Sequence, residues 1–149
     1  MKPSLRSEGI ICDETISKVL VQCDIDETFY RFPGGTVEFG ETTLEAITRE
    51  LIEEFDLAIT IGSLVVINEN LIIIDGKEIH NCTLLYKCKL QTGSNFVDPR
   101  WHNEIEGIKL TWKTIEELQL KPLYADGILN VLKNMSTDEK HHIIIKKSY

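Results

Sequence analysis

Acidic residues at helical spacing stand near the end of the segment 34–57. Glu50, Glu53 and Glu54 are three and four positions apart, so a helix would hold their carboxylates on one side, and Ala46 would leave space one turn earlier. Like charges at this spacing destabilise a helix by about 0.2–0.5 kcal/mol per pair and raise carboxylate pKa values. A hard divalent cation such as Mg²⁺ offsets that cost because it prefers carboxylate and phosphate oxygens. The pattern therefore predicts either a metal site or an ordinary solvated acidic surface.

The same segment carries signals for the ends of the helix. An apolar stripe is expected beside the acids, formed by Leu44, Ile47, Leu51 and Phe55. Thr42 followed by Glu45 is a capping-box pattern, which predicts a helix at about residues 42–55. The Gly34-Gly35 turn ahead of it lets the backbone approach a ligand or a metal closely.

From Gly35 to Leu57 the sequence resembles the Nudix box, G-x5-E-x7-R-E-U-x-E-E-x-G-U, in which U is a bulky aliphatic residue. Every fixed position matches except one, because Asp56 stands where the family has its last glycine. That glycine usually ends the helix in a left-handed conformation, which aspartate tolerates better than most residues. The departure concerns the helix end more than the metal site.

The resemblance implies an α/β protein with the Nudix fold, an α/β/α sandwich around a mixed β-sheet that carries the loop and helix of the box. We expect one Nudix hydrolase domain over residues 1–149, an ordinary size for a domain. Residues 134–149 are expected to form either a flexible tail or an extra edge strand at 143–145.

The remaining elements are expected from the hydrophobic pattern of the chain. Strands are predicted at residues 5–12, 18–23 and 108–112, and a long hairpin at 57–74 and 78–90 around the Asp75-Gly76 turn. Residues 91–107 are predicted to form a loop. A short helix is predicted from Thr114, and a second helix from Pro122 to about Lys133.

The resemblance also implies which groups hold the metal. Its main ligands would be Glu50, Glu53 and Glu54, with Glu41 assisting through a water and the carbonyl group of Gly34 or Gly35 as a further candidate. The cofactor implied is Mg²⁺, with Mn²⁺ as the alternative. Such a cation would bridge phosphate oxygens and lower the pKa of a bound water.

The residues implied in catalysis are Glu50, Arg49 and one general base. Arg49 lies four residues from both Glu45 and Glu53, so we assign it an orienting role in which it holds acids in position. A carboxylate must remove the proton from the attacking water. The candidates are Glu53 on the helix and Glu104 or Glu106 on the later loop, where solvated loop acids are the alternative interpretation.

The candidates for substrate binding lie ahead of the helix. They are Gly34 and Gly35, Arg6 and Tyr30. Arg6 would either meet an anionic substrate or lie on the surface as an ordinary arginine. Tyr30, with its neighbours Phe29 and Phe32, would supply either a base-stacking ring or core packing.

The activity implied by the resemblance is hydrolysis of the pyrophosphate bond in a nucleoside diphosphate linked to another group, through attack of water at phosphorus. The chain has isoleucine or leucine at positions 71–74, where relatives acting on ADP-ribose or dinucleoside polyphosphates tend to carry proline or tyrosine. By elimination, a nucleoside triphosphate or a nucleotide sugar is favoured. The alternative is a Nudix domain that binds nucleotides without turnover, as a sensor or regulator.

Composition restricts the partners and the compartment. A net charge of −8 argues against a basic nucleic-acid-binding surface. We expect no membrane span, because no run of about 18 apolar residues occurs, and no signal peptide at the N-terminus. The four cysteines form no CxxC pair, which favours reduced thiols in a cytoplasmic protein. The expected partner is a nucleotide-derived small molecule, and a homodimer is left open.

Overall fold

The structure is a computed structural model that describes residues 2–135 and 139–149. Within these ranges the strands are β1 (Ser4–Cys12), β2 (Lys18–Asp24), β3 (Tyr30–Arg31), β4 (Gly34–Thr36), β5 (Ile59–Ile74), β6 (Lys77–Leu90), β7 (Arg100–Trp101), β8 (Ile108–Thr114), β9 (Leu123–Tyr124) and β10 (His141–Ser148). The helices are α1 (Thr43–Phe55), α2 (Ile115–Leu118) and α3 (Leu129–Leu132).

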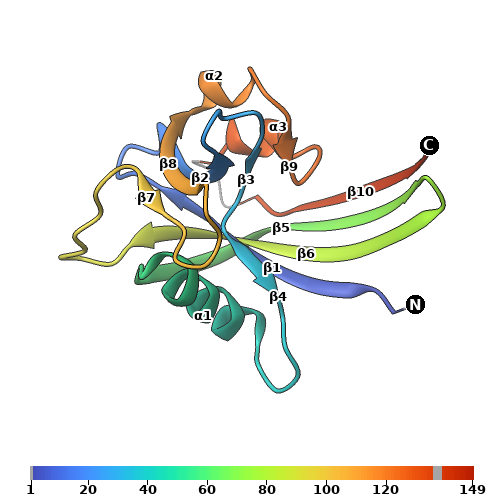
Figure 1. Cartoon of the computed structure of the whole chain (residues 1–149), viewed down its shortest axis with the longest axis horizontal. Coiled ribbons are helices and arrows are strands. Elements are labelled where there is room, and N and C mark those ends of the chain that lie inside the picture. Colours follow the sequence, from blue (N-terminus) through green and yellow to red (C-terminus); the bar gives the residue numbers. More distant parts are fainter. Residues whose placement is uncertain (1, 136–138) are drawn as a thin grey trace.

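The described strands form one mixed sheet in the order β10-β5-β6-β1-β2-β3-β9, with β4 pairing with β1 and β8 pairing with β2 and β7. The pairs β1–β6, β5–β10 and β3–β9 are parallel, and the others are antiparallel. Helix α1 lies on one side of the sheet, and α2 and α3 lie on the other (Figure 1). This arrangement confirms the predicted α/β/α sandwich.

Each face of the sheet buries its own apolar cluster. On the α1 side, Ile47, Leu51 and Phe55 of the helix pack against strand residues that include Leu20 and Leu110. All five side chains are fully buried, so this cluster anchors the helix firmly against the sheet. On the opposite side, strand residues pack against the segments that carry α2 and α3.

One position of the predicted apolar stripe on α1 was wrong. Leu44 is 44% exposed, whereas Ala46 is completely buried with Ile47, Leu51 and Phe55. The sheet therefore meets the helix through a small residue in its first turn, and Ala46 faces the core and not the acidic side. A close approach of helix and sheet favours alanine there, because a larger side chain would hold the first turn away.

The two ends of α1 follow the sequence signals. The backbone N–H of Glu45 donates to the hydroxyl oxygen of Thr42 at 3.1 Å, which caps the helix as predicted. At the other end Asp56 is left-handed, with φ 50° and ψ 45°, and its N–H donates to the carbonyl oxygens of Leu51 and Ile52. The aspartate thus takes the conformation for which the Nudix box uses glycine.

Strands β5 and β6 form the predicted long hairpin, which turns at Asp75 and Gly76 with positive φ at both residues. In Figure 1 the hairpin extends beyond the body of the protein, together with the start of β1 and the end of β10. Cross-strand partners on one face include Asn70 with Asn81 and Ile72 with Ile79. This face becomes one wall of the cleft described below.

The predicted helix from Pro122 to Lys133 was wrong. Its first part is strand β9, in which Leu123 pairs with Tyr30 of β3, and only Leu129–Leu132 is helical. Gly127 has φ +82°, a left-handed conformation that interrupts a helix. Pairing with a neighbouring strand therefore outweighed the local pattern of leucines and isoleucines.

The structure also decides the conformation of the segment 91–107 and of the C-terminal tail. The loop 91–107 contains a short strand, Arg100–Trp101, that pairs with β8. In the tail, β10 runs parallel to β5 and confirms the edge-strand alternative, while residues 136–138 lie outside the described residues. None of the described helices is long and apolar enough to span a membrane.

Candidate active site

The glycine turn and the acidic helix meet because β4 pairs with β1 immediately before α1 begins. Gly34 lies opposite Glu8 and Gly35 opposite Ser7 in this pairing. A Cβ atom placed on Gly35 would lie 2.5 Å from Oε1 of Glu50, so the Glu50 carboxylate occupies the space that any larger residue would fill. Gly34 has φ +147°, and a Cβ there would lie 2.1 Å from the carbonyl oxygen of Ser7. Both glycines are therefore required by close approach.

Arg49 gathers the acids of the motif around one guanidinium group. Its Nε and Nη2 atoms donate to the two carboxylate oxygens of Glu41 at 3.0 and 2.7 Å. Its Nη1 atom donates to Glu50 at 3.1 Å and to Glu53 at 3.2 Å. The hydrogen bond from Arg49 is the main reason that the pKa of Glu41 is lowered to about 2. Of the two acids expected within its reach, Arg49 contacts Glu53, and Glu41 takes the place expected for Glu45.

Glu50 and Glu54 interact with each other on the acidic side of the helix. Burial first, and then a hydrogen bond with Glu50 and its negative charge, raise the pKa of Glu54 to about 8. The nearby charge of Glu104 acts in the same direction, while that of Arg31 opposes it. The raised pKa favours the protonated form of the Glu54 carboxyl group near neutral pH.

The loop after β7 closes over the C-terminal end of α1. The side chain of His102 is 1% exposed, and its ring packs edge-on against Phe55 with centroids 5.1 Å apart. Its Nδ1 atom accepts backbone N–H groups of Glu104 and Ile105, both at 3.0 Å. Burial lowers the pKa of His102, so the ring is neutral and its remaining proton lies on Nε2, 3.5 Å from the Glu54 carboxylate.

The loop brings one of its two candidate acids toward the helix. Glu104 lies near enough to Glu54 and His102 for its charge to raise the pKa of both groups. Asn103 holds the loop in place, since its N–H donates to the Glu54 carbonyl at 2.7 Å and its amide to the Glu53 carbonyl at 3.0 Å. Glu106 is exposed and takes part in none of these contacts.

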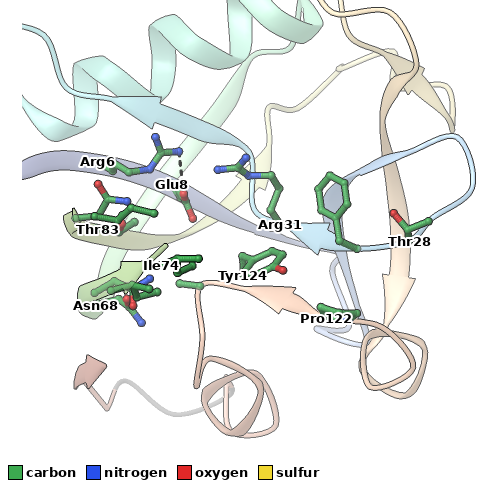
Figure 2. Close-up of a pocket in the computed structure, with 15 residues that line it drawn as sticks. Arg6, Glu8, Thr28, Arg31, Asn68, Ile74, Thr83, Pro122 and Tyr124 are labelled. Carbon is green, nitrogen blue, oxygen red and sulfur yellow. Dashed lines mark hydrogen bonds and ion pairs between the residues drawn. The ribbon is translucent and has the colours of Figure 1, made fainter. Parts of the chain in front are cut away.

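A cleft of about 580 Å³ opens on the side of β1 that carries Arg6 and Glu8. Nη2 of Arg6 lies 3.3 Å from the Glu8 carboxylate, and Figure 2 shows the guanidinium groups of Arg6 and Arg31 turned toward Glu8. Burial raises the pKa of Glu8, while both arginines lower it. The charge of Arg31 also lowers the pKa of Glu54, against the larger effects that raise it.

The structure separates the predicted substrate-binding residues. Arg6 lines the cleft, which Gly34 and Gly35 approach from the side of α1. Tyr30 is only 5% exposed, and its hydroxyl donates to Glu27 at 3.2 Å, away from the cleft. Its neighbours Phe29 and Arg31 line the cleft instead, and Arg31 does so because consecutive residues of β3 point to opposite faces.

Sequence reasoning missed several residues of the cleft. These are Glu8, Arg31, Asn68, Asn70, Asn81 and Tyr124. The asparagines had a signal, because Asn68 and Asn70 are two positions apart in an Ile- and Leu-rich strand and so share one face with Asn81 of the paired strand. Arg31 and Tyr124 had none, since their pairing in the β3–β9 ladder brings together residues far apart in sequence.

The acidic residues fit a hard divalent cation by their donor chemistry. Glu50 and Glu54 offer adjacent carboxylate oxygens, and the missing side chain at Gly35 leaves backbone close beside them. Across the described ranges, no three His, Cys, Asp or Glu side chains are already grouped as metal ligands. In this arrangement Arg49 instead forms ion pairs with Glu41, Glu50 and Glu53.

Known protein families and solved structures that resemble this chain share its fold. The family model for the NUDIX domain matches residues 6–134. A MutT protein from Bacillus halodurans superposes with a TM-score of 0.64 at 23% identity, over 96% of this chain and 90% of that chain. A NUDIX hydrolase from Nitrosomonas europaea gives 0.71 at 18% identity, over 94% of this chain and 93% of that chain.

A third structure, named an ADP-ribose pyrophosphatase from Streptococcus suis, gives a TM-score of 0.62 at 18% identity, over 96% of this chain and 99% of that chain. No curated protein matches the chain. Since the family model spans most of the sequence and the loop and helix of the box lie together on the sheet, the chain belongs to the Nudix hydrolase family.

Proposed function

We propose that this protein is a Mg²⁺-dependent pyrophosphohydrolase acting on a nucleoside diphosphate linked to another group, with a nucleoside triphosphate or a nucleotide sugar as the favoured substrate. One observation carries the proposal: Glu50 lies against Gly35 of β4, and β4 pairs with the part of β1 that carries Glu8 into a cleft lined by Arg6 and Arg31. Arg6 and Arg31 can bind phosphate oxygens, and the acids can hold the cation that such chemistry uses.

The metal would be held by Glu50 and Glu54, with Glu53 and Glu41 able to join when Arg49 releases them, and with the carbonyl of Gly34 or Gly35 as a backbone ligand. When bound, Mg²⁺ supplies charge neutralisation on the phosphate and lowers the pKa of a water. Glu53 remains a candidate general base on the helix. On the loop, proximity to Glu54 favours Glu104 over Glu106 as the second candidate.

The positioning of these groups follows from their neighbours. The neutral ring of His102 presents its Nε2 proton to Glu54 and so restrains that carboxylate. Arg49 restrains Glu50 and Glu53 from the other side. Carboxylates whose positions are set in advance by such neighbours lower the cost of reorganisation during the reaction.

Hydrolysis is tested by incubating the protein with a panel of nucleoside triphosphates and nucleotide sugars, with Mg²⁺ or Mn²⁺, and identifying both products. Glu50→Gln, Glu53→Gln and Glu54→Gln should each lower kcat by about 100-fold or more. Glu45→Gln is the matched control, because Glu45 is an exposed acid on the same helix.

Two outcomes would count against the proposal. Wild-type turnover by both Glu53→Gln and Glu54→Gln at saturating Mg²⁺ would contradict the assignment of the acids. Mg²⁺-dependent nucleotide affinity without release of any product would instead support a nucleotide-binding Nudix domain that acts as a sensor or regulator.

A further inference from the structure

One polar atom in the wall of the cleft has no partner. Within residues 2–135 and 139–149, Oδ1 of Asn70 is the only buried side-chain nitrogen or oxygen that makes no hydrogen bond. Leaving such an acceptor unpaired is costly, so the group needs a donor from outside the chain. Asn70 also lines the cleft, so a molecule bound there could supply the donor.

Asn81, the cross-strand partner of Asn70, also lines the cleft, and two other polar side chains of the lining already have partners. Nδ2 of Asn68, two positions earlier on the same face, donates to the carbonyl oxygen of Asp126 at 3.0 Å. Arg6 is held by Glu8 at the phosphate-binding end of the cleft. Beyond Asn70, toward the tip of the hairpin, the wall continues with the apolar side chains of Ile72 and Ile79.

The opposite wall of the cleft is aromatic. Phe29 and Tyr124 lie with their ring centroids 6.3 Å apart and tilted by 56°, and Tyr124 is 50% exposed. Tyr124 and Ile74 line the same cleft as Arg31, and all three are labelled in Figure 2. A flat ring between aromatic and isoleucine side chains would be stacked on its faces, and only its edge would reach an amide.

We infer that Asn70 is a specificity-determining residue, whose Oδ1 accepts a hydrogen bond from the exocyclic amino group of an adenine ring bound in this cleft. An asparagine amide is well matched to adenine, since it can accept from the amino group and donate to N7. Arg6 and Arg31 would hold the phosphates at the other end of the cleft. The inference rests on the proposed function in taking the occupant to be a nucleotide.

The inference is tested with AMP and IMP, which differ at one ring position where an amino group is replaced by a carbonyl oxygen. Neither contains a pyrophosphate bond, so dissociation constants can be measured by calorimetry on the full chain with Mg²⁺ present and no turnover. AMP should bind the wild-type protein about tenfold more tightly than IMP, because IMP leaves the buried acceptor facing an oxygen.

Three variants separate recognition from folding. Asn70→Leu removes the acceptor and should bring the ratio of the two dissociation constants close to one. Asn70→Asp keeps an acceptor oxygen and should keep the preference for AMP, even if its charge weakens both ligands. Asn95→Ala is the matched control, because Asn95 is exposed on the loop outside the cleft. Thermal unfolding of each variant verifies that it is folded.

Equal binding of AMP and IMP to the wild-type protein would overturn the inference, as would a preference that survives Asn70→Leu. Both results are distinguishable from failure of the proposed function. If pyrophosphate hydrolysis occurs without discrimination at the base, only the role of Asn70 falls. If AMP is preferred through Asn70 and no substrate is hydrolysed, the base site stands and the catalytic proposal falls.

Discussion

Replacing Gly35 by alanine should separate catalysis from folding. The added Cβ would lie 2.5 Å from Oε1 and 2.6 Å from Cδ of Glu50, whereas ordinary van der Waals contact begins at 3.4 Å. The carboxylate must therefore move by about 0.9 Å to relieve the overlap. A displacement of this size in a catalytic group can cost about 100-fold in rate.

The stability of the same variant should change little. The overlapping atoms belong to the end of a flexible side chain, and alanine also lowers the entropy of the unfolded chain, so we expect the free energy of unfolding to change by less than about 1 kcal/mol. Gly34→Ala is the contrasting variant, because its Cβ would meet backbone atoms of β1 at a positive φ. That strain should lower the free energy of unfolding by about 1–3 kcal/mol.

The measurements are kcat and KM with the best substrate of the panel, and urea unfolding of both variants. The expected pattern is a folded Gly35→Ala with strongly reduced kcat and a Gly34→Ala that loses stability. If Gly35→Ala is folded and keeps kcat/KM within about threefold of the wild type, the position of the Glu50 carboxylate does not matter for the reaction and our reasoning fails.

Three further predictions concern stability. Lys113 and then Lys109 lower the pKa of Glu27 to about 2. Glu27→Gln should therefore lose about 1 kcal/mol at pH 7, after allowance for solvent screening. The difference in free energy of unfolding between the variant and the wild type should shrink as the pH falls from about 4.5 through about 2, because a lowered carboxylate pKa stabilises the folded protein only while the carboxylate is ionised. Urea unfolding at several pH values measures this difference. A difference that stays constant with pH would contradict the prediction. Asp56→Gly should raise the free energy of unfolding by about 0.5 kcal/mol and leave activity unchanged, because glycine adopts the left-handed conformation at the helix end without strain. A lower melting temperature would argue against this prediction. His102→Phe keeps an aromatic ring but removes the acceptor for two backbone N–H groups. The variant should lose about 1–3 kcal/mol of unfolding free energy, measured with urea, and its kcat should fall. Equal stability would show that water replaces these hydrogen bonds.

The local chemistry of the acidic helix could be read from the sequence. The cap at Thr42, the left-handed Asp56, the turn at Asp75 and Gly76 and the nearness of Glu50 to Glu54 all depend on residues a few positions apart. At such separations helix and turn geometry leave few alternatives, so spacing alone predicts which groups meet.

The cleft depended on tertiary structure. Arg31 lines the cleft because β3 pairs with β2 and β9, and Tyr124 stands beside Phe29 only because a predicted helix is partly a strand. Spacing along the chain says nothing about which distant strands will pair, because that choice is made by the burial of whole faces of the sheet. The acidic helix was therefore set by neighbours in sequence, whereas the residues proposed to recognise the substrate are brought together only by the folded sheet.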